Sequence, residues 1–370
     1  MNLRIPGPTP CPEEVLQSMA QPMINHRGPG FERLIQKVTG RLKQFFQTRN
    51  DLLILTASGT GAMEAAVVNT LSPGDKVLAV SIGLFGERFA AIAETYGAEV
   101  IRLDFPWGQP ADPEAVRKAL KKSPDIKAAL ITHNETSTGV TNDLAALSAV
   151  VKELDKLLVV DAISSIGSID LPVDTWHCDV VISASQKGWM APPGVAMVSI
   201  SEEAWRFAAR AKMPRFYWDL AKAKSSLEKG QTPWTPAIST LFALEKSLDL
   251  MAQEGLSNIV ERHARVGKAT RKGVQSLGLS LLAQEQWASN TVTAVQIPQG
   301  MDAKRLLHTL REEHKVILAG GYGNLAGKII RIGHLGFVTE EDMQQVVEAL
   351  RASLLKVGFK TSHLTDVRGS

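Results

Sequence analysis

A lysine in an unusual setting lies near the middle of the sequence. Lys187 stands in SASQKGW, which directly follows an apolar run and leads into the loop sequence APPG. A lysine at a random position is normally a surface residue. A lysine held beside a buried strand, in a partly desolvated pocket near other cations, has a lowered pKa and acts as a nucleophilic amine. An aldehyde would capture such an amine as an imine.

A second candidate residue, Asp161, ends the apolar run Val159–Val160. Ligands of open α/β sheets bind beyond the carboxyl ends of the strands, so a carboxylate there faces a ligand. The alternative role, capping the next helix, explains a single aspartate equally well. As a ligand-binding residue, Asp161 would hold a proton on a heterocyclic nitrogen. Pyridoxal 5'-phosphate (PLP) needs such a carboxylate, because its protonated ring is the better electron sink.

The motif SGTGA, which contains Thr60, Gly61 and Ala62, follows an apolar run and precedes a helical pattern. Glycines allow close approach of a ligand, and the free N–H groups of a helix start attract phosphate. A plain strand-to-helix turn would also explain the motif. A dinucleotide fingerprint fits poorly because Glu64 occupies its third glycine position, and a Walker-type loop is excluded because no Gly-Lys-Ser/Thr follows. A phosphate cup for a cofactor fits best.

Arg331 is a charge inside the apolar pattern IIRIG. Buried arginine is rare without a partner, and a structural ion pair is one explanation. The other is a carboxylate ligand, because the guanidinium presents a fork of donors that matches a carboxylate. Every amino-acid substrate supplies such a group.

The elements that must position these residues follow an α/β pattern. Short Val/Ile/Leu-rich runs without polar alternation predict strands buried on both faces, hence a mainly parallel sheet covered by helices. The predicted strands are 52–57, 76–82, 99–103, 128–134, 157–162, 179–185 and 195–200, with amphipathic helices at 61–71, 86–96, 113–121 and 144–154. We expect an N-terminal segment at 1–20, a large domain at 21–258, a smaller α+β domain at 259–360 and a polar tail at 361–370.

Composition excludes several classes of function. The net charge is +3, from 41 basic and 38 acidic residues, without a block of one sign, which favours neither a nucleic-acid nor a membrane partner. The two cysteines, Cys11 and Cys178, have no metal-like spacing, so neither a metal site nor a disulfide framework is expected. No signal peptide and no membrane-spanning run occurs, and we expect a cytoplasmic protein.

Taken together, these residues resemble fold-type I, class V aminotransferases, specifically the alanine–glyoxylate and serine–pyruvate (or serine–glyoxylate) group. The similarity covers nearly the whole chain. The motifs that carry it, in family order, are GPTP, SGTGAMEAA, GLFGER, THNETSTGV, VDAISS, SQKGWMAPPG, TPWTP and RIGHLG.

The resemblance implies a role for individual residues. Lys187 would carry PLP as a Schiff base and move the proton between the substrate Cα and the cofactor, and Asp161 would pair with the pyridinium nitrogen. Arg331 would grip the substrate carboxylate, with Asn25 nearby. The remaining implied cofactor contacts are Phe85 on the ring face, Thr136 beside the ring, Thr60, Gly61, Ala62 and Gln186 at the phosphate, and Thr232 and Thr235 from the partner subunit of a homodimer.

The implied reaction is a ping-pong transamination from a small neutral donor, alanine or serine, to glyoxylate or pyruvate. The chain departs from many relatives by carrying Phe85 for Trp, Thr232 for Tyr and, in some cases, Ala62 for His. Two alternatives stay open: a 2-aminoethylphosphonate-type transaminase, and a PLP-fold subunit of a larger complex. A cysteine desulfurase is disfavoured because neither Cys11 nor Cys178 lies on the loop near the small domain that would carry its nucleophile.

Overall fold

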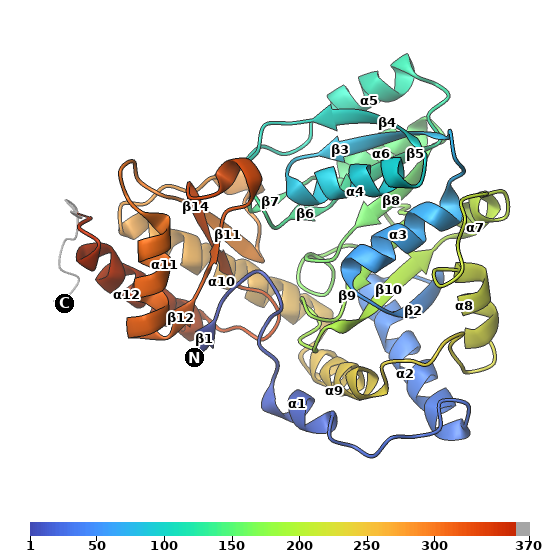
Figure 1. Ribbon diagram of the computed structural model, residues 1–370, viewed down its shortest axis with the longest axis horizontal. Helices are drawn as coiled ribbons and strands as arrows, with labels where there is room; N and C mark the ends of the chain where they lie inside the picture. The colour runs from blue at the N-terminus through green and yellow to red at the C-terminus, as the bar shows by residue number, and fades with distance from the viewer. Residues whose placement is uncertain (360–370) are drawn as a thin grey trace.

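A seven-stranded sheet forms the centre of the larger part of the molecule in the computed structural model, which describes residues 1–359 (Figure 1). The strand order is β2-β10-β9-β8-β5-β3-β4. Only β10 runs antiparallel to its neighbours; the other pairs are parallel, so the predicted α/β fold is confirmed. The strands are β2 (Asp51–Ala57), β3 (Lys76–Ser81), β4 (Glu99–Asp104), β5 (Ala128–Thr132), β8 (Leu157–Asp161), β9 (Val180–Ala184) and β10 (Gly194–Ile200).

Helices cover both faces of this sheet. One face packs against α3 (Gly59–Thr70), α4 (Leu84–Thr95), α7 (Glu202–Ala208) and α8 (Leu220–Leu227). The other packs against α2 (Pro29–Phe46), α5 (Pro113–Lys122), α6 (Leu144–Glu153) and α9 (Ile238–Glu254). Along β8, Leu158 and Val160 enter one core while Leu157 and Val159 enter the other. Burial on both sides explains why these strands read as continuous apolar runs.

A smaller part follows in sequence and contains a three-stranded antiparallel sheet in the order β11-β14-β13. Its first helix, α10, begins before the predicted domain boundary at residue 259. The predicted tail at 361–370 lies outside the described residues. The elements are α10 (Leu256–Ser276), β11 (Val292–Gln296), α11 (Ala303–His314), β12 (Val316–Ile317), β13 (Ala319–Gly320), β14 (Ile329–Gly333) and α12 (Glu340–Lys356), with 3-10 turns at Glu285–Trp287 and Gly323–Leu325.

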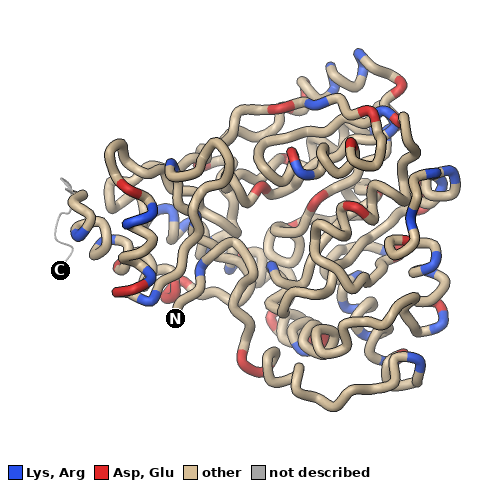
Figure 2. Tube along the Cα trace, in the orientation of Figure 1, with Lys and Arg blue, Asp and Glu red and all other residues tan. Residues whose placement is uncertain are grey.

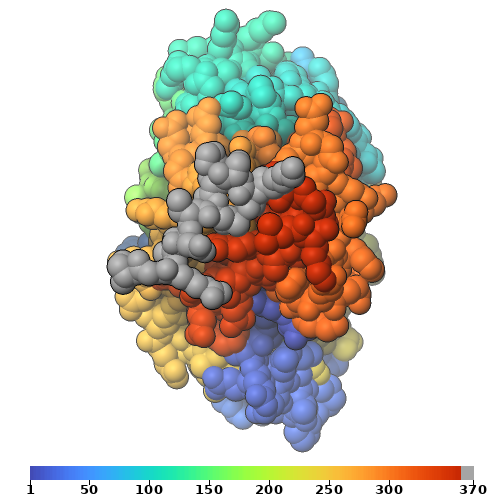
Figure 3. Space-filling view, turned by 90° about the vertical axis from the view of Figure 1, so that its left-hand side faces the viewer, coloured from blue at the N-terminus to red at the C-terminus, as the bar shows by residue number. Residues whose placement is uncertain are grey.

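The N-terminus joins this smaller part. Strand β1 (Asn2–Leu3) pairs with β12 in parallel, and the chain then runs through α1 (Glu13–Ser18) into the large part (Figure 1). Figure 3 shows the C-terminal elements, in orange and red, between the teal region above and the N-terminal residues below. The first residues therefore cross from one part of the molecule to the other, and they pass close to the carboxyl edge of the large sheet.

A buried hairpin, β6 (Asn134–Glu135) with β7 (Val140–Thr141), connects the two parts. The Asn134 side-chain amide donates to Ser164 Oγ at 2.8 Å in the large part and to Thr291 Oγ1 at 2.9 Å in the small part. The hairpin thereby holds both parts at the edge where the candidate residues lie.

Charge is distributed evenly along the trace, with Lys and Arg interspersed among Asp and Glu (Figure 2). No helix within residues 1–359 is long and apolar enough to span a membrane. Among the same residues, no cluster of three or more His, Cys, Asp or Glu side chains is arranged to hold a metal ion. The cytoplasmic location stays a prediction.

Candidate active site

A cavity of 370 Å³ lies between the carboxyl edge of the large sheet and the small C-terminal sheet. Six of the predicted site residues line it: Thr60, Phe85, Thr136, Gln186, Lys187 and Arg331. The other lining residues are Ile5, Pro6, Gly7, Pro8, Ser58, Gly59, Arg88, Ile163, Pro193, Ala319 and Tyr322. Residues separated by more than 300 positions thus converge on one space.

Lys187 lies in a loop that is fixed from several sides. The side chain of Trp189, fully buried, donates from Nε1 to Ser183 Oγ at 2.7 Å and stacks on Phe46. The N-terminal segment holds the other side, because Thr9 donates to the carbonyl of Gln186 from its N–H at 3.1 Å and to that of Lys187 from its hydroxyl at 3.1 Å. The loop positions the Lys187 side chain toward the cavity, so this lysine is not the surface residue that its type alone would predict.

The Lys187 ammonium is desolvated and faces other charges. Its Nζ donates to the Pro6 carbonyl at 2.5 Å. Burial lowers the pKa of Lys187 to about 8, Asp161 opposes that shift, and the cations of Arg331 and Arg88 add to it. A sizeable fraction of neutral amine is therefore present near neutral pH, which a nucleophilic role requires.

Asp161 ends β8 and is buried, with 3% of its surface exposed. Burial raises its pKa to about 7, while the Ile163 N–H, which donates to Oδ1 at 2.9 Å, lowers it. Within residues 1–359, Oδ2 accepts no hydrogen bond. A cationic N–H group placed against Oδ2 would restore the charged form of this carboxylate, as a protonated pyridine nitrogen does.

The first turn of α3 borders the cavity through Ser58, Gly59 and Thr60. The N–H groups of Gly61 and Ala62 are already bonded to Ser58, to Oγ at 3.3 Å and to the carbonyl at 3.2 Å. Both residues are buried behind the cavity wall. The N–H groups of Gly59 and Thr60 have no helical acceptor and are the donors that an anion would meet first.

Phe85 begins α4, and a remote carboxylate caps that helix start. Glu135 Oε2 accepts from the N–H groups of Phe85 at 3.0 Å and Gly86 at 3.2 Å, while Oε1 accepts from Ser137 N at 3.0 Å and Oγ at 2.6 Å. The N-cap residue Gly83 offers no side chain of its own. Glu135, although fully buried, thus fixes Phe85 relative to the hairpin that carries Thr136.

Arg331 crosses from the small sheet into the cavity. Its Nε donates to the Gly320 carbonyl at 2.8 Å and its Nη1 to the Thr136 carbonyl at 3.0 Å. The Tyr322 ring lies against the guanidinium at 4.2 Å from its centroid. No carboxylate within residues 1–359 pairs with Arg331, although only 3% of this residue is exposed. Its Nη2 group is left to bind an anion from the cavity, which favours the carboxylate role over the structural ion pair.

Three predicted contacts lie away from this cavity in the same chain. Thr232 is buried and donates to the Trp234 carbonyl at 2.7 Å, Thr235 is exposed, and Asn25 is exposed. The segments that carry them are joined, because Arg27 Nη1 donates to the Thr232 carbonyl at 2.6 Å. Their roles stay predictions, and they require the cavity of a second subunit.

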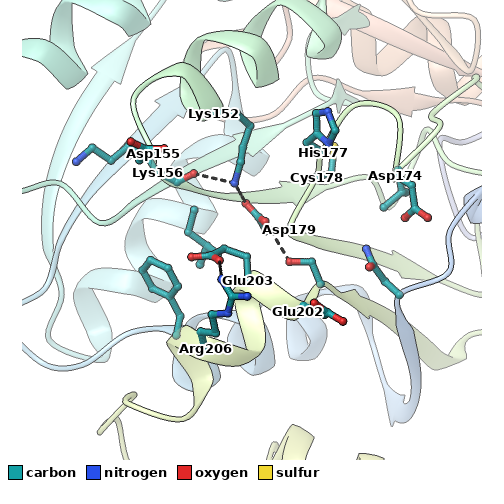
Figure 4. A pocket seen from close by; sticks show the side chains of 15 residues that line it. Lys152, Asp155, Lys156, Asp174, His177, Cys178, Asp179, Glu202, Glu203 and Arg206 are labelled. Carbon is teal, nitrogen blue, oxygen red and sulfur yellow. Dashed lines mark hydrogen bonds and ion pairs between the residues drawn. The ribbon is translucent and has the colours of Figure 1, made fainter.

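A second cavity, of 600 Å³, opens at the amino-terminal edge of the sheet (Figure 4). Its buried carboxylate, Asp179, already accepts from Lys152 Nζ at 2.7 Å, Leu158 N at 2.8 Å and Ser201 Oγ at 3.1 Å. These bonds hold β8, β9 and α6 together. Although this cavity is larger, its central charges are paired, so the chemistry is assigned to the cavity around Lys187.

The cysteines are poor nucleophiles in this structure. Burial raises the pKa of Cys11 to about 11 and that of Cys178 to about 12, which disfavours the reactive thiolate. Neither residue lines the Lys187 cavity. Both observations argue against a cysteine-based reaction.

Several residues of the site were not identified from sequence: Pro6, Gly7 and Tyr322, which line the cavity, and Glu135, which caps the start of α4 at Phe85. A signal existed for Glu135, because it stands in a polar run directly after an apolar strand. For Tyr322 the signal was its place among three glycines before IIRIG. The approach of Pro6 and Gly7 to Lys187 depends on the pairing of β1 with β12 and had no local signal.

The groups around the cavity fit PLP. Asp161 does not itself line the cavity, but its Oδ2 accepts no hydrogen bond within residues 1–359 and would pair with the ring nitrogen, while Lys187 would bind the aldehyde. Gln186 lines the same cavity as Gly59 and Thr60, and its side-chain amide nitrogen would donate to the phosphate together with the open N–H groups of those two residues. These unsatisfied groups match the ends of one molecule of PLP.

Comparisons with known proteins agree with this fit. The family model described as Aminotransferase class-V matches residues 2–355. A Synechococcus protein named the small subunit of a soluble hydrogenase is 44% identical over 96% of this chain and 94% of its own. The L-aspartate–glyoxylate aminotransferase of Paracoccus denitrificans is 36% identical (91% and 86% covered), and the serine–glyoxylate aminotransferase of Methylorubrum extorquens 35% identical (98% and 92% covered).

A solved structure extends the likeness to the fold. The alanine–glyoxylate aminotransferase from Nostoc sp. superimposes with a TM-score of 0.92 at 33% identity, covering 95% of each chain.

The pH dependence of PLP capture tests the electrostatics at Lys187. We expect the rate at which the apoprotein captures PLP to rise about tenfold per pH unit below the pKa of Lys187 and to level off above about 8. Replacing Arg331 by Met removes a cation, raises that pKa and moves the midpoint upward, whereas Arg102→Met, on the surface, leaves it in place. Stopped-flow absorbance measures the rate. A wild-type midpoint near 10.5, the ordinary lysine value, would contradict this account.

Gly7→Ala tests the contact between the N-terminal segment and Lys187. A Cβ at Gly7 would lie 2.5 Å from Lys187 Nζ, at a φ of +138°. We expect weaker PLP binding and a stability loss of about 1–2 kcal/mol from the strained backbone.

Gly74→Ala is the matched control, because Gly74 also has positive φ but its Cβ would meet nothing within 4 Å. Denaturant unfolding of both variants measures the stability lost to backbone strain. PLP titration measures the effect of the contact between residue 7 and Lys187, which only Gly7→Ala changes. The interpretation is wrong if Gly7→Ala binds PLP as tightly as the wild type.

Proposed function

Because the chain belongs to the class V aminotransferase family, whose cofactor is PLP, we propose that it transfers an amino group from alanine or serine to glyoxylate or pyruvate. The observation that carries the proposal is Arg331, a buried arginine without a carboxylate partner in residues 1–359, on the cavity wall that also contains Lys187. The relatives named for serine–glyoxylate and alanine–glyoxylate transfer support the choice of substrates.

The residues divide the work of transamination. PLP supplies an electron sink for the electrons of the donor Cα–H bond. Asp161 keeps the ring nitrogen protonated, and Arg331 binds the substrate carboxylate so that the Cα–H bond faces Lys187. Lys187 Nζ would take up the proton of the donor Cα and later give it back, a role that its lowered pKa suits. The 2-oxo acid formed from the donor leaves before the acceptor 2-oxo acid binds, and Arg331 binds the carboxylate of each.

The walls of the cavity favour a small donor. Tyr322 covers one face of the Arg331 guanidinium, and Pro6 and Gly7 approach Lys187 from the N-terminal side. A methyl or hydroxymethyl side chain needs little space beyond the carboxylate and the reacting carbon.

A homodimer is part of the proposal. Phe216 and Tyr217, 72% and 42% exposed, stack with Trp234 at centroid distances of 5.0 and 6.0 Å. An exposed aromatic patch of this kind marks an interaction surface. Because it adjoins Thr232 and Thr235, which lie away from their own chain's cavity, a second copy of the chain is the partner that gives these threonines a cofactor to contact.

Half-reactions test the substrate class. We expect alanine and serine, added singly to the PLP form without an acceptor, to remove the visible absorption band of the cofactor, while aspartate and 2-aminoethylphosphonate leave it unchanged. Lys187→Ala should slow the reaction about 10²- to 10⁴-fold, because the proton carrier is lost. Lys246→Ala, a surface lysine paired with Glu14, is the control.

The outcomes separate the candidates. Reaction with aspartate but not alanine or serine would refute the proposed donors, and reaction with 2-aminoethylphosphonate would favour the alternative transaminase. A PLP-binding protein that reacts with no amino donor would support a subunit of a larger complex, the role in which the Synechococcus relative is named.

Mixing two inactive variants tests the shared active site. Lys187→Ala removes the lysine that a chain supplies to its own cavity. The triple variant Asn25→Ala, Thr232→Ala, Thr235→Ala removes the contacts that a chain supplies to the cavity of its partner. Refolding them together forms hybrid dimers in which one site carries both lesions and the other carries none. For equal amounts we expect about a quarter of wild-type activity. Activity that stays at the sum of the separate variants would contradict shared sites.

A further inference from the structure

Arg88 is a second arginine in the cavity, and it has no assigned role. It lies on α4 three residues after Phe85, so both side chains project from the same helix face. Its guanidinium lies 4.7 Å from the centroid of the Phe85 ring, and Nη1 donates to Thr60 Oγ1 at 3.3 Å. Arg88 is therefore directed at the first turn of α3.

Arg88 is half-buried, and its guanidinium has no carboxylate partner among residues 1–359. No Asp or Glu oxygen lies within 4 Å of it in the part of the chain that the structure describes. The buried carboxylate of Glu135 is occupied by the N–H groups of Phe85 and Gly86 and by Ser137. An arginine that loses water without gaining an anion is costly, so its retention here points to an anion that comes from outside the protein.

The position of Arg88 indicates which anion this is. A phosphate monoester carries about 1.5 to 2 negative charges at pH 7, whereas a helix start contributes only about half a positive charge. The first turn of α3 contains no basic residue, and the Ala62 side chain adds no donor. Arg88 supplies the missing charge at the place where Thr60 and the open N–H groups lie.

We propose that Arg88 binds the phosphate of PLP together with Thr60, and that Arg331 is thereby left as the one arginine of the cavity, among residues 1–359, for a substrate carboxylate. The inference rests on the proposed function and narrows its substrate class. A dicarboxylic donor such as aspartate needs a second cation, and Arg88 is committed to the cofactor. The site then selects amino acids and 2-oxo acids with a single carboxylate.

Cofactor affinity, measured with and without the phosphate, tests this assignment. The full-length apoprotein is titrated with PLP and with pyridoxal, which has the same aldehyde and ring but no phosphate, and Kd is read from tryptophan fluorescence and visible absorbance. We expect Arg88→Gln to weaken PLP binding about 10- to 100-fold, the loss typical of a charged hydrogen bond. Pyridoxal binding should weaken far less, because pyridoxal loses only the influence of Arg88 on the pKa of Lys187. Arg88→Lys, which keeps the charge, should lose less.

Arg102→Gln is the matched control, because Arg102 pairs with Glu94 on the outer side of the same helix and should change neither Kd. Thermal unfolding of each apoprotein separates a folding defect from a binding defect. Equal weakening of PLP and pyridoxal by Arg88→Gln, or no change in either, would overturn the proposal. An unchanged Kd for PLP combined with a raised KM for a dicarboxylate would overturn it too, by placing Arg88 at the substrate.

Failure of the proposed donors is a separate result. If Arg88→Gln loses PLP affinity selectively while neither alanine nor serine reacts with the wild type, the donor assignment fails and the phosphate assignment stands.

Discussion

The desolvated ammonium of Lys187 is the constraint on which the rest of the site depends. Placing an amine in a protein interior favours its neutral form, and Arg331 and Arg88 strengthen that tendency while Asp161 opposes it. The balance leaves Lys187 able to act both as nucleophile and as proton carrier near neutral pH. This balance requires that Lys187, Asp161, Arg88 and Arg331 stay in fixed positions relative to one another. The contacts around the cavity hold them there.

The fold meets this requirement by bringing distant segments to one edge. Asp161 ends β8, and Lys187 follows the neighbouring parallel strand β9. Arg331 comes from the small sheet and is tied to the large part through the Thr136 carbonyl. The N-terminal segment passes between the two parts and holds the Lys187 loop through Thr9. A change in how the two parts meet would therefore alter the electrostatics at Lys187 as well as the shape of the cavity.

Sequence alone predicts the central sheet and several of the chemical groups. The strands that end at Asp161 and lead to Lys187 are buried on both faces, so their apolar runs are unambiguous. Helix α2 lay outside the predicted elements, and so did the antiparallel direction of β10. The contacts of Glu135 with the start of α4, and of Gly7 with Lys187, connect residues remote in sequence and follow no local pattern. Secondary-structure propensity is a property of one local segment. These contacts depend instead on how separate segments pack against each other.

Chemical trapping tests the central claim, that PLP is held by Lys187, most directly. The PLP-loaded protein is reduced with sodium borohydride, which makes the lysine–cofactor bond permanent, then digested and analysed by mass spectrometry. The account predicts one modified peptide, carrying the label on Lys187. A label on another lysine, or a loaded protein that yields no labelled peptide, would contradict it.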